Sequence, residues 1–208
     1  MKLVIVDYQL GNLFSVKQAC INLGFPAELT CDPDILHQAD AVILPGVGAF
    51  AEAMSTLKKD GMDQALVDFV KTGKPFFGVC LGMQLLLTAS VEFDEARGLG
   101  IEDGVIRRIP AQGRKVPQIG WNQIHPAQGG QDWSKTPLRD VKHGDYMYFV
   151  HSYYCAPAHP GVELCRTNYY GFDYCSALVR DNVFATQFHP EKSGPAGLSI
   201  YENWLKAI

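Results

Sequence analysis

Short apolar runs alternate with helix-like segments in the N-terminal part of the chain, and this alternation limits the possible folds more than any other feature. Leu3–Val6 and Ala41–Leu44 are continuous apolar runs, as expected of strands buried on both faces of a parallel sheet. Two further strands are expected over residues 25–30 and 75–79. Strands that alternate with helices in this way predict a parallel, doubly wound sheet.

The segments between these strands carry helix signals. Asn12 can cap a helix that runs to Leu23, and Gly24 can then end it. Further helices are expected over residues 49–58, 62–71 and 83–89.

The second half of the chain has a different pattern. Strand-like segments over residues 98–122, 146–154 and 163–189 are separated by Gly, Pro, Asn and Asp. A final helix carries an apolar stripe of Leu198, Tyr201, Leu205 and Ile208, which should pack onto the rest of the molecule. With no linker or repeat, residues 1–208 are expected to form a single three-layer α/β domain with a mixed, mostly parallel sheet.

Composition excludes several classes of protein. The 208 residues include 18 Lys and Arg against 22 Asp and Glu, a formal net charge of −4, and no basic stripe typical of a nucleic-acid binder. No apolar run approaches the roughly 20 residues of a membrane span, and Asp7 comes too early for a signal peptide. We therefore expect a cytoplasmic protein that binds neither nucleic acid nor membrane. Its six cysteines are not expected to form disulfides or a metal site.

One cysteine lies in a chemically suggestive motif. Gly78-Val79-Cys80-Leu81-Gly82 has the form Gly-x-nucleophile-x-Gly, at the point where a predicted buried strand gives way to a helix. The glycines leave room for a sharp turn, and the helix N-terminus favours a thiolate over a thiol. The alternative is a buried cysteine beside packing glycines. The strand–turn–helix context favours Cys80 as a nucleophile.

A thiolate nucleophile needs a base, and the base needs a group that orients it. His189 and Glu191 follow the strand-like residues 183–186, and in an extended segment two such residues would point the same way. Glu191 would then hold the His189 imidazole in one tautomer. The alternative is a loop histidine beside a surface glutamate. Of the other five histidines only His151, at the end of an apolar strand, rivals His189; the rest should be exposed.

The glycine-rich segment after the third strand fits the dinucleotide fingerprint G-x-G-x-x-A from Gly46 to Ala51. That fingerprint should follow the first strand, so nucleotide binding is not expected. The glycines of Gly46-Val47-Gly48 can instead expose backbone N–H groups to a developing oxyanion.

Together these motifs resemble the triad-type (class I) glutamine amidotransferases. The resemblance rests on Pro45–Gly48, Gly78–Gln84 and His189–Glu191, in this order. Residues 7–12, 115–122, 148–154 and 188–193 narrow it to the glutaminase subunits of imidazole glycerol phosphate synthase.

The resemblance implies a flavodoxin-like fold, hydrolysis of L-glutamine to glutamate and ammonia, and no metal or organic cofactor. It implies that Cys80 is the nucleophile, His189 the acid and base, and Glu191 its orienting partner. The implied oxyanion donors are Leu81 and the Val47–Gly48 segment, and the implied substrate-binding residues are Gln84, Ser152 and Tyr153. It also implies docking on a (β/α)₈ cyclase subunit, which would receive the ammonia. The matching interface positions are Leu10, Asn12, Trp121, Tyr148 and Lys192.

Trp121 is expected on an exposed loop, because the neighbouring Asn122 and Gln123 are polar. Gln9 departs from the family pattern, since it replaces the glycine that usually follows Asp-Tyr. We expect the turn to adjust rather than to hold Gln9 at a positive φ.

Three alternatives remain open: the glutaminase domain of another synthase, a γ-glutamyl peptidase, and a non-catalytic binding subunit with this fold.

Overall fold

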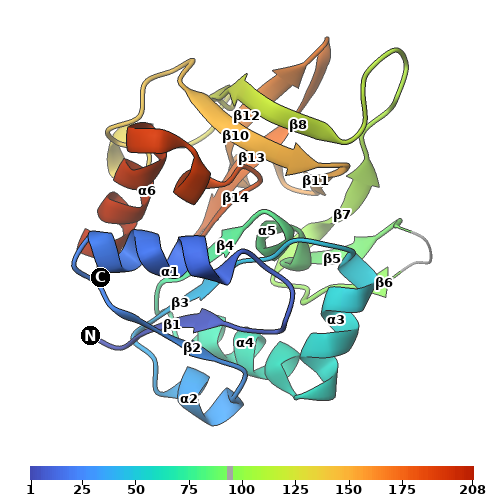
Figure 1. The fold of residues 1–208 in the computed structure, drawn as a ribbon. Coiled ribbons are helices and arrows are strands. Elements are labelled where there is room, and N and C mark those ends of the chain that lie inside the picture. The colour runs from blue at the N-terminus through green and yellow to red at the C-terminus, as the bar shows by residue number, and fades with distance from the viewer. Residues whose placement is uncertain (93–95) are drawn as a thin grey trace.

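The computed structural model describes residues 1–92 and 96–208 (Figure 1). The helices are α1 (Leu13–Asn22), α2 (Pro33–His37), α3 (Phe50–Lys59), α4 (Met62–Lys71), α5 (Leu81–Leu85) and α6 (Gly194–Lys206). The strands of the N-terminal half are β1 (Leu3–Val6), β2 (Ala27–Thr30), β3 (Ala41–Leu44), β4 (Phe76–Val79), β5 (Leu87–Ser90) and β6 (Ala96–Arg97). Those of the C-terminal half are β7 (Glu102–Arg108), β8 (Gln118–Gln123), β9 (His125–Pro126), β10 (Tyr146–His151), β11 (Tyr153–Pro157), β12 (Glu163–Tyr169), β13 (Phe172–Arg180) and β14 (Val183–Thr186). Short 3₁₀ turns are η1 (Trp133–Lys135), η2 (Pro160–Val162) and η3 (Pro190–Lys192).

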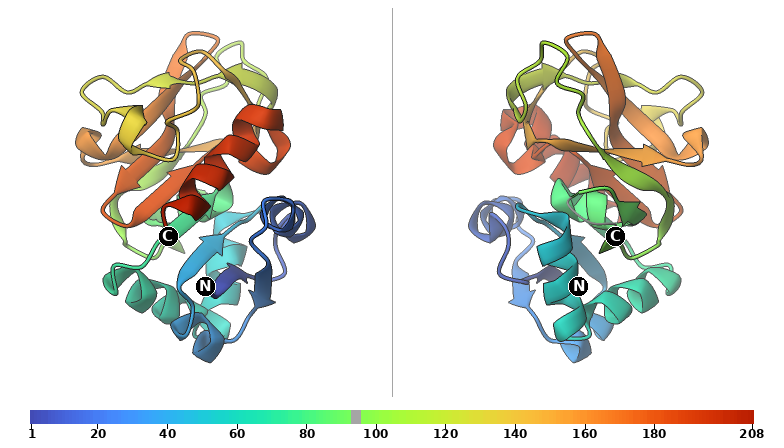
Figure 2. Two further views of the ribbon diagram at one scale, coloured as in Figure 1. Left: turned by 90° about the vertical axis from the view of Figure 1, so that its left-hand side faces the viewer. Right: turned by 90° about the vertical axis from the view of Figure 1, so that its right-hand side faces the viewer.

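The central sheet is mixed, and its two halves have different connectivity. The strand order is β2-β1-β3-β4-β14-β13-β11-β7-β5-β6. From β2 to β14 every pair is parallel, whereas β14, β13, β11 and β7 are joined by antiparallel pairs. A separate antiparallel ribbon of β10 and β8 lies with the other strands of the second half, above the N-terminal half in Figures 1 and 2. The expected α/β class with a mixed sheet is confirmed.

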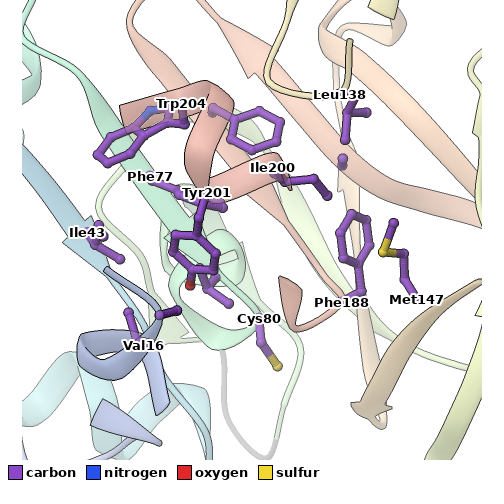
Figure 3. Packing of buried hydrophobic residues seen from close by; sticks show 14 of the residues in the cluster. Val16, Ile43, Phe77, Cys80, Leu138, Met147, Phe188, Ile200, Tyr201 and Trp204 are labelled. Atoms are coloured by element: carbon purple, nitrogen blue, oxygen red, sulfur yellow. The ribbon is translucent and has the colours of Figure 1, made fainter. Parts of the chain in front are cut away.

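The parallel half is covered on both faces, which explains why its strands are apolar throughout. Alternate residues of β1 enter different clusters: Leu3 and Ile5 pack with α1 and α6, and Val4 and Val6 pack with α3 and α4. Figure 3 shows Tyr201 of α6 in the first cluster, with Cys80 at its edge. Both clusters are built around buried side chains. This layering is the one predicted for a doubly wound sheet.

The predicted helix over residues 83–89 is wrong in its second half. Helix α5 ends at Leu85, and residues 87–90 form β5, which pairs in parallel with β7. Periodicity cannot separate a buried helix from a buried strand when the run is short and wholly apolar. Trp121 is likewise on a strand, β8, although it is exposed as expected.

The ends of two helices differ from the prediction in detail. Gly24 ends α1 at φ +85° as expected, but the Asn12 side chain accepts no backbone N–H as a cap and instead accepts a hydrogen bond from Ser15 Oγ at 3.0 Å. Helix α6 ends at Lys206, so Ile208 lies outside it and is exposed, whereas Tyr201 and Leu205 are buried.

No helix in the described ranges has both the length and the apolar character needed to cross a membrane. All six cysteines lie in the described ranges and are free thiols; five are buried and Cys31 is exposed.

The expectation for Gln9 is wrong: the turn does not adjust, and Gln9 adopts φ +65°. A left-handed conformation costs a residue with a side chain roughly 1–2 kcal/mol. The Gln9 N–H donates to Asp7 Oδ1 at 3.0 Å, a bond that does not depend on the Gln9 side chain.

We therefore predict that Gln9→Gly raises the free energy of unfolding by about 1 kcal/mol, because glycine removes the strain at a small entropic cost. Guanidinium unfolding measures this. The matched control is Gln38→Gly, since Gln38 has φ −83° and relieves no strain. If Gln9→Gly were no more stable than the parent protein, the conclusion that Gln9 is strained would be contradicted.

Candidate active site

Cys80 lies in a turn that only small neighbours allow. It follows β4 directly, precedes α5, and has φ +56° and ψ −107°. A Cβ atom at Gly82 would lie 1.8 Å from the backbone oxygen of Leu44, and one at Gly78 would lie 3.0 Å from that of Gly82. The Cys80 N–H donates to the Thr186 carbonyl at 2.7 Å, which fixes the turn to β14. A strained conformation held on several sides is typical of a functional residue.

His189 and Glu191 form a buried pair. His189 Nδ1 lies 2.8 Å from Glu191 Oε1, and both side chains are almost fully buried. Residues 190–192 form η3 rather than the extended segment that was expected, so the pairing is present but its geometric reason was wrong. The second ring nitrogen, Nε2, is buried and has no hydrogen-bond partner among the described residues.

The protonation of His189 depends on its charged neighbours. Burial alone would lower the pKa of His189, but a Cys80 thiolate and the Glu191 carboxylate outweigh it and raise the pKa to about 10. An imidazolium beside a thiolate is the pair expected of an activated cysteine nucleophile.

His151 is not available as a base, although it lies near the site. Burial lowers the pKa of His151 to about 4, so its ring is neutral at neutral pH. Its Nδ1 lies 2.8 Å from the Tyr153 carbonyl and its Nε2 lies 3.1 Å from the Tyr174 hydroxyl. Both nitrogens are therefore used. The other four candidate histidines, His37, His125, His143 and His159, are exposed as expected.

A cavity of about 260 Å³ opens beside Cys80 and is lined by the predicted oxyanion and substrate-binding residues, whereas His189 and Glu191 do not line it. Its lining includes Val47, Gly48, Leu81, Gln84, Ser152 and Tyr153, together with His151, Glu92, Pro117 and Val150. A larger groove of about 600 Å³ runs along β8 past Trp121, but neither Cys80 nor His189 lines it.

The Val47–Gly48 segment lies close to Cys80, but the other predicted oxyanion donor, the Leu81 N–H, is already occupied. The Leu81 N–H donates to the Gly46 carbonyl at 3.3 Å. Gly48 adopts φ +111°, a conformation that side chains disfavour, and Val47 is exposed. Leu10 lies against this segment, 3.8 Å from where a Cβ of Gly48 would be.

Three of the five predicted interface residues form one cluster. The rings of Trp121 and Tyr148 meet edge to face with centroids 6.1 Å apart, and Lys192 Nζ lies 6.0 Å from the Tyr148 ring centre. Trp121 is 55% exposed, which is unusual for a tryptophan. Leu10 and Asn12 are half-buried in the turn before α1.

Sequence reasoning missed three residues of the site. Glu92 is buried in the cavity wall, where Oε2 accepts the Phe50 N–H at 2.8 Å. Tyr8 donates to the Pro45 carbonyl at 2.8 Å, directly beneath the oxyanion segment. Gln187 contacts Cys80. All three have partners that are distant in sequence, so no local motif could have revealed them.

The described residues contain no group of three or more His, Cys, Asp or Glu side chains that could hold a metal ion.

Comparisons with known proteins agree with this geometry. A protein of Geobacter metallireducens, "Imidazole glycerol phosphate synthase subunit HisH", is 43% identical over 97% of this chain and 96% of its own. The protein with the same description from Methanothermobacter thermautotrophicus is 44% identical over 99% of this chain and 98% of its own. A solved "glutamine amidotransferase" has the same fold, with TM-score 0.75 at 22% identity and 99% coverage of both chains. A chain of PurLQS from Thermotoga maritima has TM-score 0.76 at 17% identity, covering 99% of this chain and 98% of its own. The family model "Glutamine amidotransferase class-I" matches residues 4–208, and the chain therefore belongs to this family.

Proposed function

We propose that this chain hydrolyses L-glutamine to glutamate and ammonia through Cys80, His189 and Glu191, with residues 1–208 acting as one glutamine amidotransferase domain. The observation that carries the proposal is a strained cysteine beside a buried His189–Glu191 pair, at a cavity large enough for an amino acid. The relatives described as imidazole glycerol phosphate synthase subunit HisH support the substrate and the pathway.

The reaction has two stages. The Cys80 thiolate attacks the side-chain amide carbon of glutamine, while the His189 imidazolium gives its proton to the leaving nitrogen, so that ammonia departs and a γ-glutamyl thioester remains. His189, now neutral, takes a proton from water, whose oxygen attacks the thioester and releases glutamate. Glu191 accepts a hydrogen bond from the Nδ1–H of His189 throughout, and this directs Nε2 toward the reacting atoms.

The cavity wall suggests how the amino-acid end of glutamine is held. Gln84, Ser152 and Tyr153 are proposed to bind it, and Glu92 adds a buried carboxylate suited to the α-ammonium group. No metal or organic cofactor enters these steps.

The partner is proposed to be the (β/α)₈ cyclase subunit of imidazole glycerol phosphate synthase, in a heterodimer in the cytoplasm. The cyclase would use the ammonia to make imidazole glycerol phosphate and AICAR in histidine biosynthesis. Trp121, Tyr148 and Lys192 would form the main contact, with Leu10 and Asn12 beside the oxyanion segment. Exposed aromatic and cationic anchors of this kind dominate many interfaces.

Cys80→Ser should abolish glutamine-dependent synthesis, because a serine hydroxyl does not ionise readily at this site. Synthesis from ammonium salts by the complex should persist, since the cyclase is untouched. Ammonia release from glutamine is the measurement. A mutant that retains more than a few per cent of the parent rate would show that Cys80 is not the nucleophile.

His189→Ala should lose nearly all glutaminase activity, a reduction of roughly 10⁴-fold or more in kcat. Glu191→Gln should lose less, because an amide oxygen can still accept a hydrogen bond from Nδ1. Steady-state kinetics on folded variants compare the two. Equal inactivity would mean that Glu191 does more than orient His189.

Gly48→Ala should lower the stimulated glutaminase rate, which is measured with the cyclase and its nucleotide ligand present. Its Cβ would make only an ordinary van der Waals contact with Leu10, at 3.8 Å, so the effect comes from backbone strain at φ +111°, on the order of 1–3 kcal/mol. The matched control is Gly73→Ala, which introduces similar strain at φ +76° far from the site and should leave the stimulated rate unchanged.

The same segment predicts how the partner controls the chain. With the Leu81 N–H bonded to Gly46, the isolated chain lacks one oxyanion donor and should hydrolyse glutamine slowly. The loaded cyclase should raise the rate by about 10²–10³, the effect of one such donor. A free chain as fast as the liganded complex would instead indicate a constitutive glutaminase.

A further inference from the structure

Gln187 is a fully buried residue that contacts the nucleophile itself. It directly follows β14, and its backbone N–H donates to the Ser176 carbonyl at 2.9 Å, which fixes its position. Its side-chain Nε2 donates to Cys80 Sγ at 3.6 Å. Neither the cysteine motif nor the histidine motif accounts for this contact.

The direction of the Gln187 amide follows from one group whose chemistry is fixed. The Tyr153 carbonyl can only accept hydrogen bonds, so the group of Gln84 that lies 2.9 Å from it must be the amide NH₂. That same NH₂ lies 3.0 Å from the Gln187 side chain, which must therefore present its oxygen. The Gln187 NH₂ is then left facing the sulfur. The hydrogen-bond network therefore fixes which end of the Gln187 amide is oxygen and which is nitrogen.

We propose that Gln187 belongs to the catalytic machinery as a hydrogen-bond donor to Cys80 that stabilises its thiolate. This rests on the proposed function, because it requires Cys80 to be the nucleophile. The donor is neutral, so it does not change charge when His189 gives up its proton. Gln84 thus has a second role besides the proposed binding of substrate: it holds Gln187 in the donating orientation.

The donor acts on both stages of the reaction. When the sulfur–carbon bond forms, the electron pair of the thiolate passes into that bond and the sulfur becomes a weaker acceptor. When water attacks the thioester, the sulfur–carbon bond breaks, the pair returns to sulfur, and the Gln187 N–H meets it again. A thiolate held in this way is more abundant at low pH but less nucleophilic once formed.

Other groups that face Cys80 must be separated from Gln187. They are His189 with Glu191 from η3, Tyr8 after β1, Cys155 on β11, and Glu92 and His151 in the cavity. Burial raises the pKa of Tyr8 and that of Cys155 well above their ordinary values, so both stay neutral. A substitution at Gln187 leaves all six side chains in place.

The test is Gln187→Met, which keeps the length of the side chain and removes the donor. The rate of Cys80 alkylation by iodoacetamide is measured on the full chain across pH, and peptide mapping separates Cys80 from the exposed Cys31. The pH of half-maximal labelling should rise by about one unit, and the plateau rate at high pH should not fall. In the complex with the liganded cyclase, kcat should fall by about tenfold, with less change in KM.

Two further variants make the outcome decisive. Ser176→Ala is the matched control, because it removes a buried hydroxyl without a partner in the described part of the chain and should leave the labelling profile unchanged. If Gln187→Met does not fold, Gln84→Met frees the Gln187 amide and should raise the labelling midpoint in the same direction. An unshifted midpoint, or a lower plateau without a shift, would overturn the role of Gln187. Failure of the parent chain to label at Cys80 would instead overturn the proposed function.

Discussion

The contact between the turn after β4 and the end of β3 sets the geometry of the whole site. Gly82 lies so close to the Leu44 carbonyl that no side chain fits between them. This contact presses the start of α5 onto the sheet and holds Cys80 at a positive φ. It also brings Leu81 within reach of the Gly46 carbonyl, because Gly46 is the second residue after β3. Cys80 and the segment proposed to hold the oxyanion are therefore placed by one packing constraint.

The proposed base, His189, reaches this turn from another part of the sheet. Strand β14 pairs in parallel with β4, so the two strands end at the same edge, and the segment after β14 carries both Gln187 and His189. The His189 N–H donates to the Tyr148 carbonyl at 2.9 Å, and Ser193 Oγ accepts the Tyr148 N–H at 2.9 Å. Through these two bonds the backbone of β10 is fixed to the loop that carries the base. The Tyr148 side chain meets Trp121 and Lys192, so the surface proposed for the partner is one hydrogen bond from His189.

Sequence patterns predicted the parts of this arrangement that are local. The buried strands β1 and β3 were visible as apolar runs, and the glycines around Cys80 predicted a tight turn that the structure contains. The boundary between α5 and β5 was not predictable, because an apolar run fits either element when its pairing strand is unknown. The roles of Glu92 and Gln187 could not be predicted, because their partners Phe50 and Cys80 lie 42 and 107 positions away in the sequence, respectively. The prediction for Gln9 failed for a different reason. The path of the chain requires a positive φ at this position, although glutamine disfavours that conformation.

In the proposed mechanism, forming the charged pair at Cys80 and His189 and stabilising the oxyanion are separate tasks of this site. The raised pKa of His189, to about 10, arises from the charges of Cys80 and Glu191 and opposes the effect of burial. The His189–Glu191 pair is almost fully buried, so salt screens it little. Both side chains lie below the surface, so a docking partner would not touch them directly. The proposed control point is the hydrogen bond from Leu81 to Gly46, because Gly46 is followed by the exposed Val47 and Gly48, and Gly48 has a positive φ and lies next to Leu10. Under this proposal the partner acts on a donor to the oxyanion and leaves the buried His189–Glu191 pair unchanged.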